Sequence, residues 1–314
     1  MDRISSMRLP IRLIPVKTDF NFIKYKSLAF FLSILISIAA IGFVTFKGLN
    51  LGIDFSGGII FEVRLQGSSD SDDAIADLRK ALTKHGYGNA IIQNSGKPED
   101  VMIRLQSQNN TNQVEEISRI KEILTSEFSH TVEFRKIDYV GPKVGKELIK
   151  NGMQALVVSI ICMLIYIWSR FDWQFGIGAV VSLAHDAIVT LGFYSISGYD
   201  FDLTSVAAVL TIIGYSINDT VVIYDRVREN LTKYQNDTIK NIVNISINET
   251  LSRTIMTVAT TLLVCLSLVL VGGEVLRGFS MALLFGIAFG TYSSIYIAAP
   301  ILIHTSLKVS EKTS

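Results

Sequence analysis

The sequence predicts a polytopic α-helical membrane protein with six transmembrane helices and one α+β domain between the first and second of them. Its 314 residues are 49% hydrophobic, and the mean hydropathy of +0.40 is high for a soluble protein. Six apolar segments approach the length of about 20 residues that a membrane-spanning helix needs. One polar region, residues 47–151, is long enough to fold by itself.

The six apolar segments are residues 27–46, 153–169, 174–196, 203–224, 253–271 and 279–303. They divide the chain into a cytoplasmic N-terminal segment (1–26), a transmembrane helix (27–46), a periplasmic domain (47–151), three transmembrane helices (152–224), a cytoplasmic loop (225–252), two transmembrane helices (253–303) and a cytoplasmic tail (304–314).

The distribution of Lys and Arg predicts that both chain ends lie in the cytoplasm, because cytoplasmic loops are enriched in these residues. Basic residues precede the first span, and the loop 225–252 contains Arg226, Arg228 and Lys233. The loop 197–202 contains neither Lys nor Arg. The first apolar run is longer than the core of about 7–15 residues in a signal peptide, and no A-x-A site follows it, so we expect an uncleaved anchor.

The polar region 47–151 shows the alternation of half-buried strands and the apolar periodicity of amphipathic helices. Its predicted elements are a strand at 61–65, a helix at 71–86, strands at 90–93 and 101–105, a helix at 112–128 and a strand at 131–137. The order β-α-β-β-α-β predicts a ferredoxin-like domain. Because a fold alone does not define an activity, we expect only a binding or mechanical module outside the membrane.

Two charged residues lie in predicted spans, Asp219 in the fourth and Arg253 at the start of the fifth. Such a residue at the centre of a bilayer costs roughly 2.5–3.5 kcal/mol on insertion scales. Intramembrane ionisable residues therefore face the protein interior, usually have a partner and are functional by default. The sequence predicts an ion pair between Asp219 and Arg253 that responds to protons.

Further polar residues accompany the two charges. Tyr215 precedes Asp219 by one helical turn, and Thr257 follows Arg253 by one turn. The third span contains His185 and Asp186. Since all these groups must avoid lipid, they can do so by facing one another. We expect Asp186 to be either a second relay or a structural polar contact, and His185 to be a packing residue.

The predicted chemistry is a proton carrier. A carboxyl group in a low-dielectric site favours its protonated form, and a nearby Arg opposes this. Movement of Arg253 relative to Asp219 would therefore load or release a proton. Because Arg does not lose its proton in proteins, Asp219 is the predicted carrier. The alternative is an ion pair that only holds two helices together.

Two glycine-containing motifs flank the polar domain. The first contains Gly52, Asp54, Gly57 and Gly58, and the second contains Gly141, Pro142 and Gly145. Glycine permits positive φ and close approach of backbones. These motifs are either turns that join the domain to the membrane part or hinges that pass membrane motion to the domain.

Several function classes lack support in the sequence. A net charge of +1 and the absence of a basic domain give no indication of nucleic-acid binding. Cys162 and Cys265 lie in apolar runs and are expected to be core residues. We see no catalytic motif, metal-ligand spacing or phosphate-binding loop, and we expect no cofactor and no enzymatic activity.

Four motifs in order resemble the SecD/SecF family, and within it the SecF group, which is related to resistance-nodulation-division transporters. The motifs are GIDFSGG at 52–58, VGPKVGKEL at 140–148, GYSINDTVVIYDRVREN at 214–230 and SRTIMT at 252–257. The resemblance covers nearly the whole chain. It places the family's membrane aspartate on Asp219 and its arginine on Arg253.

The resemblance implies a protein of the bacterial inner membrane that pairs with SecD and associates with the SecYEG channel, SecA and YajC. It implies that inward proton movement drives late export of unfolded secretory polypeptides, with the outer domain handling the emerging chain and the spans contacting membrane lipid. Three alternatives stay open at this point: half of a proton-coupled exporter for small molecules or lipids, an intramembrane aspartyl protease using Asp186 and Asp219, and a scaffold for other Sec components.

Overall fold

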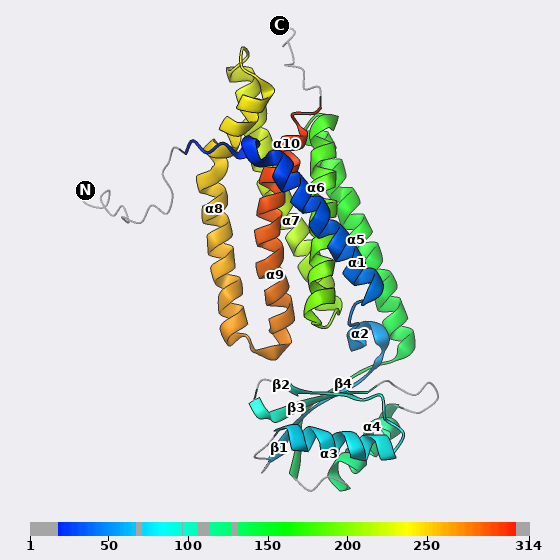
Figure 1. Cartoon of the computed structure of the whole chain (residues 1–314). Helices are drawn as coiled ribbons and strands as arrows, with labels where there is room; N and C mark the ends of the chain where they lie inside the picture. Colours follow the sequence, from blue (N-terminus) through cyan, green and yellow to red (C-terminus); the bar gives the residue numbers. More distant parts are fainter. Residues whose placement is uncertain (1–17, 67–70, 96, 106–112, 127–130, 306–314) are drawn as a thin grey trace, which may run out of the picture.

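The computed structural model describes residues 18–66, 71–95, 97–105, 113–126 and 131–305. A bundle of long helices forms one part of the molecule, and a small sheet domain lies at one end of it (Figure 1). Most of the predicted N-terminal segment and tail, and the C-terminal end of the predicted helix 112–128, lie outside the described residues.

The bundle contains all the long helices of the described chain. They are α1 (Lys26–Phe46), α5 (Pro142–Arg170), α6 (Trp173–Ser197), α7 (Leu203–Lys233), α8 (Ile239–Val271) and α9 (Gly273–Ser293). Short elements flank them: the 3-10 helix η1 (Phe22–Tyr25), α2 (Ile53–Ser56), the π-helix η2 (Ser294–Ala298) and α10 (Ala299–Ile301). Six helical stretches of the described residues are long and apolar enough to cross a membrane, which confirms the six-span prediction.

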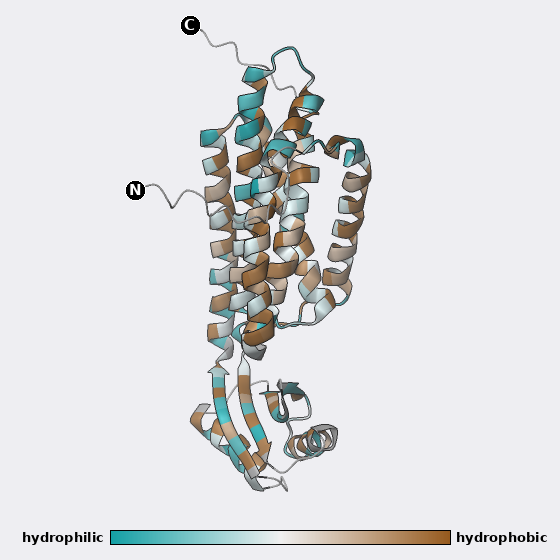
Figure 2. Cartoon of the chain, turned by 90° about the vertical axis from the view of Figure 1, so that its left-hand side faces the viewer, coloured by the Kyte–Doolittle hydropathy of each residue, from teal (hydrophilic) through white to brown (hydrophobic). Residues whose placement is uncertain are grey.

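Three helices form the interior of the bundle, and three lie around them. The apolar stretches of α6 and α9 are 61% and 56% buried, and that of α7 is 44% buried. The corresponding values are 17% for α1 and 11% for both α5 and α8. Apolar residues run along the bundle, whereas hydrophilic residues gather at the helix ends far from the sheet domain (Figure 2). Buried polar residues such as Asp186, Ser216 and Ser293 lie on the three interior helices.

Two helices extend well beyond the predicted spans. α5 begins directly after the sheet domain, at Pro142, and α7 and α8 form a long hairpin. The region 225–252, predicted as a loop, is therefore largely helical, with its turn between Lys233 and Ile239. Val227, Val243 and Ile247 are buried in this hairpin. Their helical spacing buries one apolar face of each arm even though the sequence there is polar.

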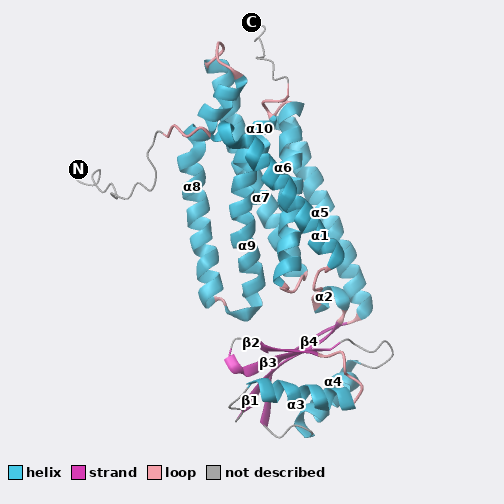
Figure 3. Ribbon diagram, in the orientation of Figure 1, coloured by secondary structure: helices cyan, strands magenta, loops and turns pink. Residues whose placement is uncertain are grey.

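The sheet domain has four strands in the order β2-β3-β1-β4, and all neighbouring strands are antiparallel. Its elements are β1 (Gly58–Gln66), α3 (Ser71–Lys84), β2 (Ile91–Ser95), β3 (Lys97–Leu105), α4 (Gln113–Ser126) and β4 (Thr131–Val140). Their sequence along the chain is the predicted β-α-β-β-α-β order. Helices α3 and α4 cover the sheet face away from the bundle, so the other face points toward the bundle (Figure 3).

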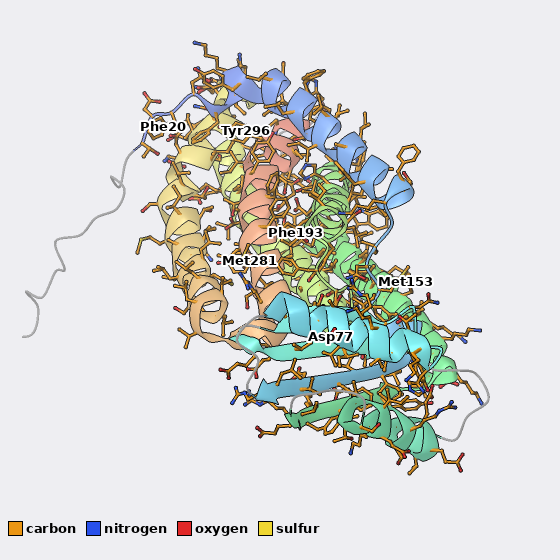
Figure 4. The ribbon with its side chains drawn as sticks, turned by 60° about the horizontal axis from the view of Figure 1, so that its bottom comes forward. Phe20, Asp77, Met153, Phe193, Met281 and Tyr296 are labelled. Carbon is orange, nitrogen blue, oxygen red and sulfur yellow. The ribbon has the colours of Figure 1, made fainter. Side chains whose placement is uncertain are left out.

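Alternation along the strands explains the two faces of the sheet. Phe61 and Val63 on β1 and Ile103 on β3 are fully or almost fully buried beneath α3 and α4. Residues between them, such as Glu62 and Met102, belong to the opposite face. Figure 4 views this domain from below, with Asp77 on the outer side of α3 and Phe193 within the bundle.

Candidate functional site

Asp219 lies in the middle of α7, where this helix packs against α8 and α9. It is only 3% exposed. Thr254 Oγ1 on α8 donates a hydrogen bond to Asp219 Oδ1 at 3.3 Å. Asp219 Oδ2 is buried and has no hydrogen-bond partner among the described residues. Thr291 of α9 is close by, but its hydroxyl donates to the Ile287 carbonyl of its own helix. One oxygen of this buried carboxyl group therefore has no hydrogen-bond donor among the described residues.

Arg253 and Asp219 lie on adjacent helices, and the positive charge of Arg253 acts on the carboxyl group. Arg253 is exposed on the surface of the chain, however, and forms no ion pair with Asp219 in the described structure. Thr254 makes the direct contact instead. Successive helical residues point about 100° apart, because 3.6 residues complete a turn, so only one of the two neighbours can face α7. The structure thus brings the predicted pair together without a direct contact.

A row of polar contacts, which we call the α7–α8 seam, links Tyr215, Asp219, Arg226 and Asn230 of α7 to α8. The Tyr215 hydroxyl donates to the Thr257 carbonyl at 2.7 Å and lies 2.8 Å from Thr261 Oγ1. Asn230 donates to Ser246 and Glu249, and Arg226 donates to Glu249. The predicted proximity of Tyr215 and Thr257 is present, although the Thr257 backbone rather than its side chain accepts the bond.

The Asp186 carboxyl group lies within hydrogen-bond distance of three side chains in the bundle interior. It is 1% exposed. Its Oδ2 accepts from Ser216 Oγ at 2.5 Å and from Ser293 Oγ at 2.8 Å. Its Oδ1 lies 3.0 Å from His185 Nδ1. The carboxyl group thus joins α6, α7 and α9, the three interior helices.

A π-helical turn explains how two consecutive serines of one helix face the same interior. η2 begins at Ser294, directly after Ser293. Ser293 bonds Asp186, whereas Ser294 Oγ bonds the Ser216 carbonyl and lies 2.8 Å from Thr220 Oγ1. π-helical turns inside α-helices occur frequently at functional sites. Nothing in the sequence indicates these contacts except the serine pair itself.

His185 is only partly the packing residue that we predicted. It is buried, and its ring lies 6.4 Å from that of Tyr292. Its Nε2 nitrogen is buried and has no partner among the described residues. A buried polar atom without a partner is unusual, since most such groups are hydrogen-bonded.

The two buried aspartates do not form a catalytic dyad. Asp186 contacts Ser216, Ser293 and His185, and Asp219 contacts Thr254, so the two carboxyl groups share no partner in the described structure. An aspartyl protease needs two carboxyl groups that share one proton. The geometry gives no support to that alternative.

The first glycine motif contacts the beginning of α7. Asp54, in the short helix α2, accepts a hydrogen bond from the Leu203 backbone N–H at 3.1 Å. Asp202, the N-cap of α7, accepts from the Ser205 N–H at 2.8 Å. The first turn of a helix has N–H groups without intrahelical partners, and carboxylates satisfy them well. Two acidic residues therefore hold the end of α7 that lies next to the sheet domain, which we call its outer end.

The second glycine motif packs against the first. Gly141 is the N-cap of α5, and Pro142 is the first residue of this helix. Gly145 lies inside α5 against α2: a Cβ atom there would be 3.0 Å from the Phe55 carbonyl oxygen and 3.2 Å from that of Asp54. The motifs thus form one close junction, in which a side chain at Gly145 would push against the backbone of α2.

Gly52, Gly57 and Gly58 set the backbone path through this junction. A Cβ atom on Gly52 would be 2.9 Å from the Asp202 Cβ atom. Gly57 and Gly58 have φ values of 71° and 138°, which residues with a Cβ atom rarely adopt. The chain turns there from α2 into β1.

A polar cleft of about 650 Å³ separates the open face of the sheet from the outer end of the bundle. Glu62, Arg104 and Lys136 line it from the sheet, and Asp200 and Phe279 line it from the bundle. The hydrogen bond from Lys136 to Asp138 raises the pKa of the Lys136 amine above its ordinary value. The mixture of charges is unlike the enclosed apolar pocket that an exporter of small molecules would need.

A smaller, apolar groove of about 360 Å³ lies at the other end of the bundle. Phe20 and Tyr296, which are close together in Figure 4, are among its lining residues. In the described structure no group of three or more His, Cys, Asp or Glu side chains could hold a metal ion.

The fold and this site define a class: a six-span membrane protein with carboxyl groups buried among its inner helices and a small α+β domain at one end. Comparison with known families identifies it further. The C-terminal family of the protein export membrane proteins SecD and SecF matches residues 119–308, and the SecD/SecF GG motif matches residues 42–68. The chain belongs to the SecD/SecF family.

Individual relatives agree with this assignment. The protein translocase subunit SecF of Rickettsia bellii is 49% identical over 303 residues, which cover 96% of this chain and 99% of the relative. That of Rickettsia prowazekii is 47% identical over 293 residues, or 93% of each chain. These relatives are named as translocase subunits and not as enzymes.

Among solved structures, SecDF from Thermus thermophilus, a translocon-associated membrane protein, is similar to this chain with a TM-score of 0.81 and 36% identity. The match covers 93% of this chain but only 39% of the SecDF chain. The chain therefore corresponds to less than half of that larger protein.

Proposed function

We propose that the chain is the proton-driven subunit of a protein-export complex and that, together with SecD, it assists the export of secretory polypeptides across the bacterial inner membrane. The observation that carries the proton chemistry is the buried Asp219 carboxyl group with one unpartnered oxygen. Family membership supports the role in protein export.

The proposed cycle uses the difference between the two forms of Asp219. The protonated acid needs little compensation in a low-dielectric site, whereas the carboxylate depends on donors and nearby positive charge. Thr254 supplies one donor, and Arg253, the residue before it in α8, supplies the charge. A shift of α8 along α7 would change both together. It would thereby couple proton binding to movement along the α7–α8 seam.

The membrane potential provides enough energy for such a cycle. One proton charge that crosses 100 mV releases about 2.3 kcal/mol. That exceeds the net contribution of about 0.5–1.5 kcal/mol of an ordinary hydrogen bond. A proton moving inward across 100 mV can therefore rearrange about one to four hydrogen bonds of the seam per cycle.

The exposure of Arg253 supports a partner at this face. Asn218 on α7 is also exposed, although it lies in a membrane-spanning helix. Polar groups at membrane depth rarely face lipid. We assign this face to SecD. Contacts with SecYEG, SecA and YajC, and with the unfolded polypeptide, belong to the same proposal through the family.

The proposed orientation follows from charge. The C-terminal part of α7 contains Arg226, Arg228 and Lys233. This end of the α7–α8 hairpin lies far from the sheet domain (Figure 1). Because Lys and Arg favour the cytoplasmic side, this end faces the cytoplasm and the sheet domain faces the periplasm. The acidic loop 198–202 then lies on the periplasmic side.

The experiment is polypeptide export into inverted membrane vesicles after ATP is exhausted, with and without an imposed proton gradient. We expect Asp219→Asn to abolish the stimulation by the gradient, because the amide cannot carry the proton. Asp225→Asn is the matched control, since it makes the same change on the same helix in a residue that pairs with Arg170 at the bundle end. Full stimulation in Asp219→Asn would contradict the proposal.

A further inference from the structure

We propose that Arg104 and Asp200 form a positioning pair that holds the sheet domain against the outer end of α7. The contact itself is supported by the positions of the two side chains. Its role in transmitting motion rests on the function proposed above.

Arg104 is unusual for a residue of an exposed sheet face. Its neighbours in β3, Ile103 and Leu105, point into the core of the domain, so Arg104 points toward the bundle. It is nevertheless only 8% exposed. Its Nη1 donates to Asp200 Oδ1 at 3.0 Å, and its Nη2 bonds Asp200 Oδ2. Two parallel bonds between a guanidinium and a carboxylate fix orientation as well as distance.

Asp200 belongs to a loop that is held from several sides. The side chain of Asn50, in the segment between α1 and α2, donates to Asp200 Oδ1 at 2.8 Å. Ser205 Oγ donates to the Asp200 carbonyl at 2.9 Å. Three residues further along, Leu203 is bonded by Asp54. Asn50 and Asp54, which precede β1, and Arg104, which follows it, thus all form hydrogen bonds with the loop before α7 or with the first residue of α7.

The surroundings of the pair suit a contact that can open. The polar cleft next to it leaves much of the sheet face unpacked against the bundle. Arg104 Nε is buried but has no hydrogen-bond partner among the described residues, so the guanidinium is not fully satisfied in this state. Polar interfaces between domains permit relative motion by default. A few polar contacts, rather than a dry apolar interface, therefore decide the position of the sheet domain.

The pair is mechanically connected to Asp219. Sixteen residues separate Leu203 from Asp219 within α7, which corresponds to about 24 Å at about 1.5 Å per residue. A displacement of α7 at the proton site moves its outer end as part of one rigid helix. The loop 198–202 then passes the displacement through Asp200 to Arg104 and β3.

The test measures the position of the sheet domain directly. Spin labels are attached to Lys80→Cys on α3 and Leu270→Cys on α8, because both positions are exposed. The full-length chain also carries Cys162→Ser and Cys265→Ala, so that only these two positions are labelled. It is assembled with its membrane partner in nanodiscs. We expect a single narrow distance distribution with Arg104 intact. Arg104→Met removes the ion pair but keeps an apolar stem, and it should broaden the distribution at least twofold. The charge swap Arg104→Asp with Asp200→Arg should restore most of the narrow population.

Arg64→Met is the matched control, because Arg64 pairs with Asp100 inside the sheet domain and not with the bundle. It should leave the distribution unchanged. The proposal is overturned if Arg104→Met matches the unaltered chain, if the swap fails to restore the distribution, or if Arg64→Met broadens it as much. If Arg104→Met broadens the distance distribution but the Asp219→Asn variant still supports proton-stimulated export, the positioning pair is supported and the proposed proton function is contradicted.

Discussion

At the scale of single residues, the two buried aspartates differ in how well their surroundings satisfy them. Asp186 has three polar neighbours, whereas Asp219 has one donor at 3.3 Å and one free oxygen. A well-satisfied carboxylate rigidifies its helices, and an under-satisfied one can exchange a proton. We therefore assign Asp186 to structure and Asp219 to proton exchange.

This contrast predicts unequal effects of two equivalent substitutions on the free energy of unfolding. Asp186→Asn replaces a carboxylate that accepts two hydroxyl donors at one oxygen, and we expect a loss of about 1–3 kcal/mol. Asp219→Asn resembles the protonated acid in shape and keeps an acceptor for Thr254, so we expect a smaller loss than for Asp186→Asn. Thermal unfolding of the purified complex in detergent compares them. A larger loss in Asp219→Asn would contradict the assignment.

Part of the site could be predicted from single residues. Asp219, Arg253, Tyr215 and Thr257 stand out because charged and polar residues are costly in apolar helices. Ser293, Ser294 and Thr254 do not, since Ser and Thr are common in membrane helices and can bond their own backbone. Arg104 looked like any polar residue of a half-buried strand. Its partner Asp200 is 96 positions away, and only the packing of the domain on the bundle brings them together.

At the scale of elements, the junction between α2 and α5 depends on a glycine in the second turn of a helix. The Phe55 and Asp54 carbonyl oxygens occupy the space where a side chain on Gly145 would lie. The sequence identified both glycine motifs but could not show that they touch. That contact requires α5 to begin at Pro142, and the apolar run from which the span was predicted starts only at residue 153.

We predict that Gly145→Ala weakens this junction, because the new methyl group would lie 3.0 Å from a backbone oxygen that cannot move alone. Proton-stimulated export should fall several-fold, and limited proteolysis between α2 and β1 should become faster. Gly152→Ala, in the same helix, is the control: its Cβ would meet only Val206 at 3.8 Å. It should be neutral or slightly stabilising, since alanine favours helix by up to about 1 kcal/mol over glycine. Equal effects of the two changes would refute the junction's role.

At the scale of the whole molecule, the membrane-spanning helices differ in how much of their surface is exposed and in how polar that surface is. α5 and α8 are only 11% buried over their apolar stretches, and the face with Arg253 and Thr260 carries polar groups. Six spans and the order of the sheet domain followed from hydropathy and periodicity. The arrangement of inner and outer helices did not, because all six segments are similarly apolar and their packing is set by long-range contacts.

We expect a photoreactive thiol reagent attached to Thr260→Cys to cross-link to SecD in native membranes. Thr260 lies two turns from Arg253 on α8, so it belongs to the face that we assign to the partner. Leu35→Cys on α1, which is 52% exposed in this chain, is the control and should label lipid. Cross-linking from Leu35→Cys alone would place the partner on the opposite side of the bundle.

The proposed mechanism requires that Asp219 gain and lose a proton. Infrared difference spectra of the purified complex between low and high pH report the carbonyl band of protonated carboxyl groups directly. We predict a band that is absent in Asp219→Asn and unchanged in Asp225→Asn. A band that persists at full intensity in Asp219→Asn would show that another group carries the proton and would contradict the proposed mechanism.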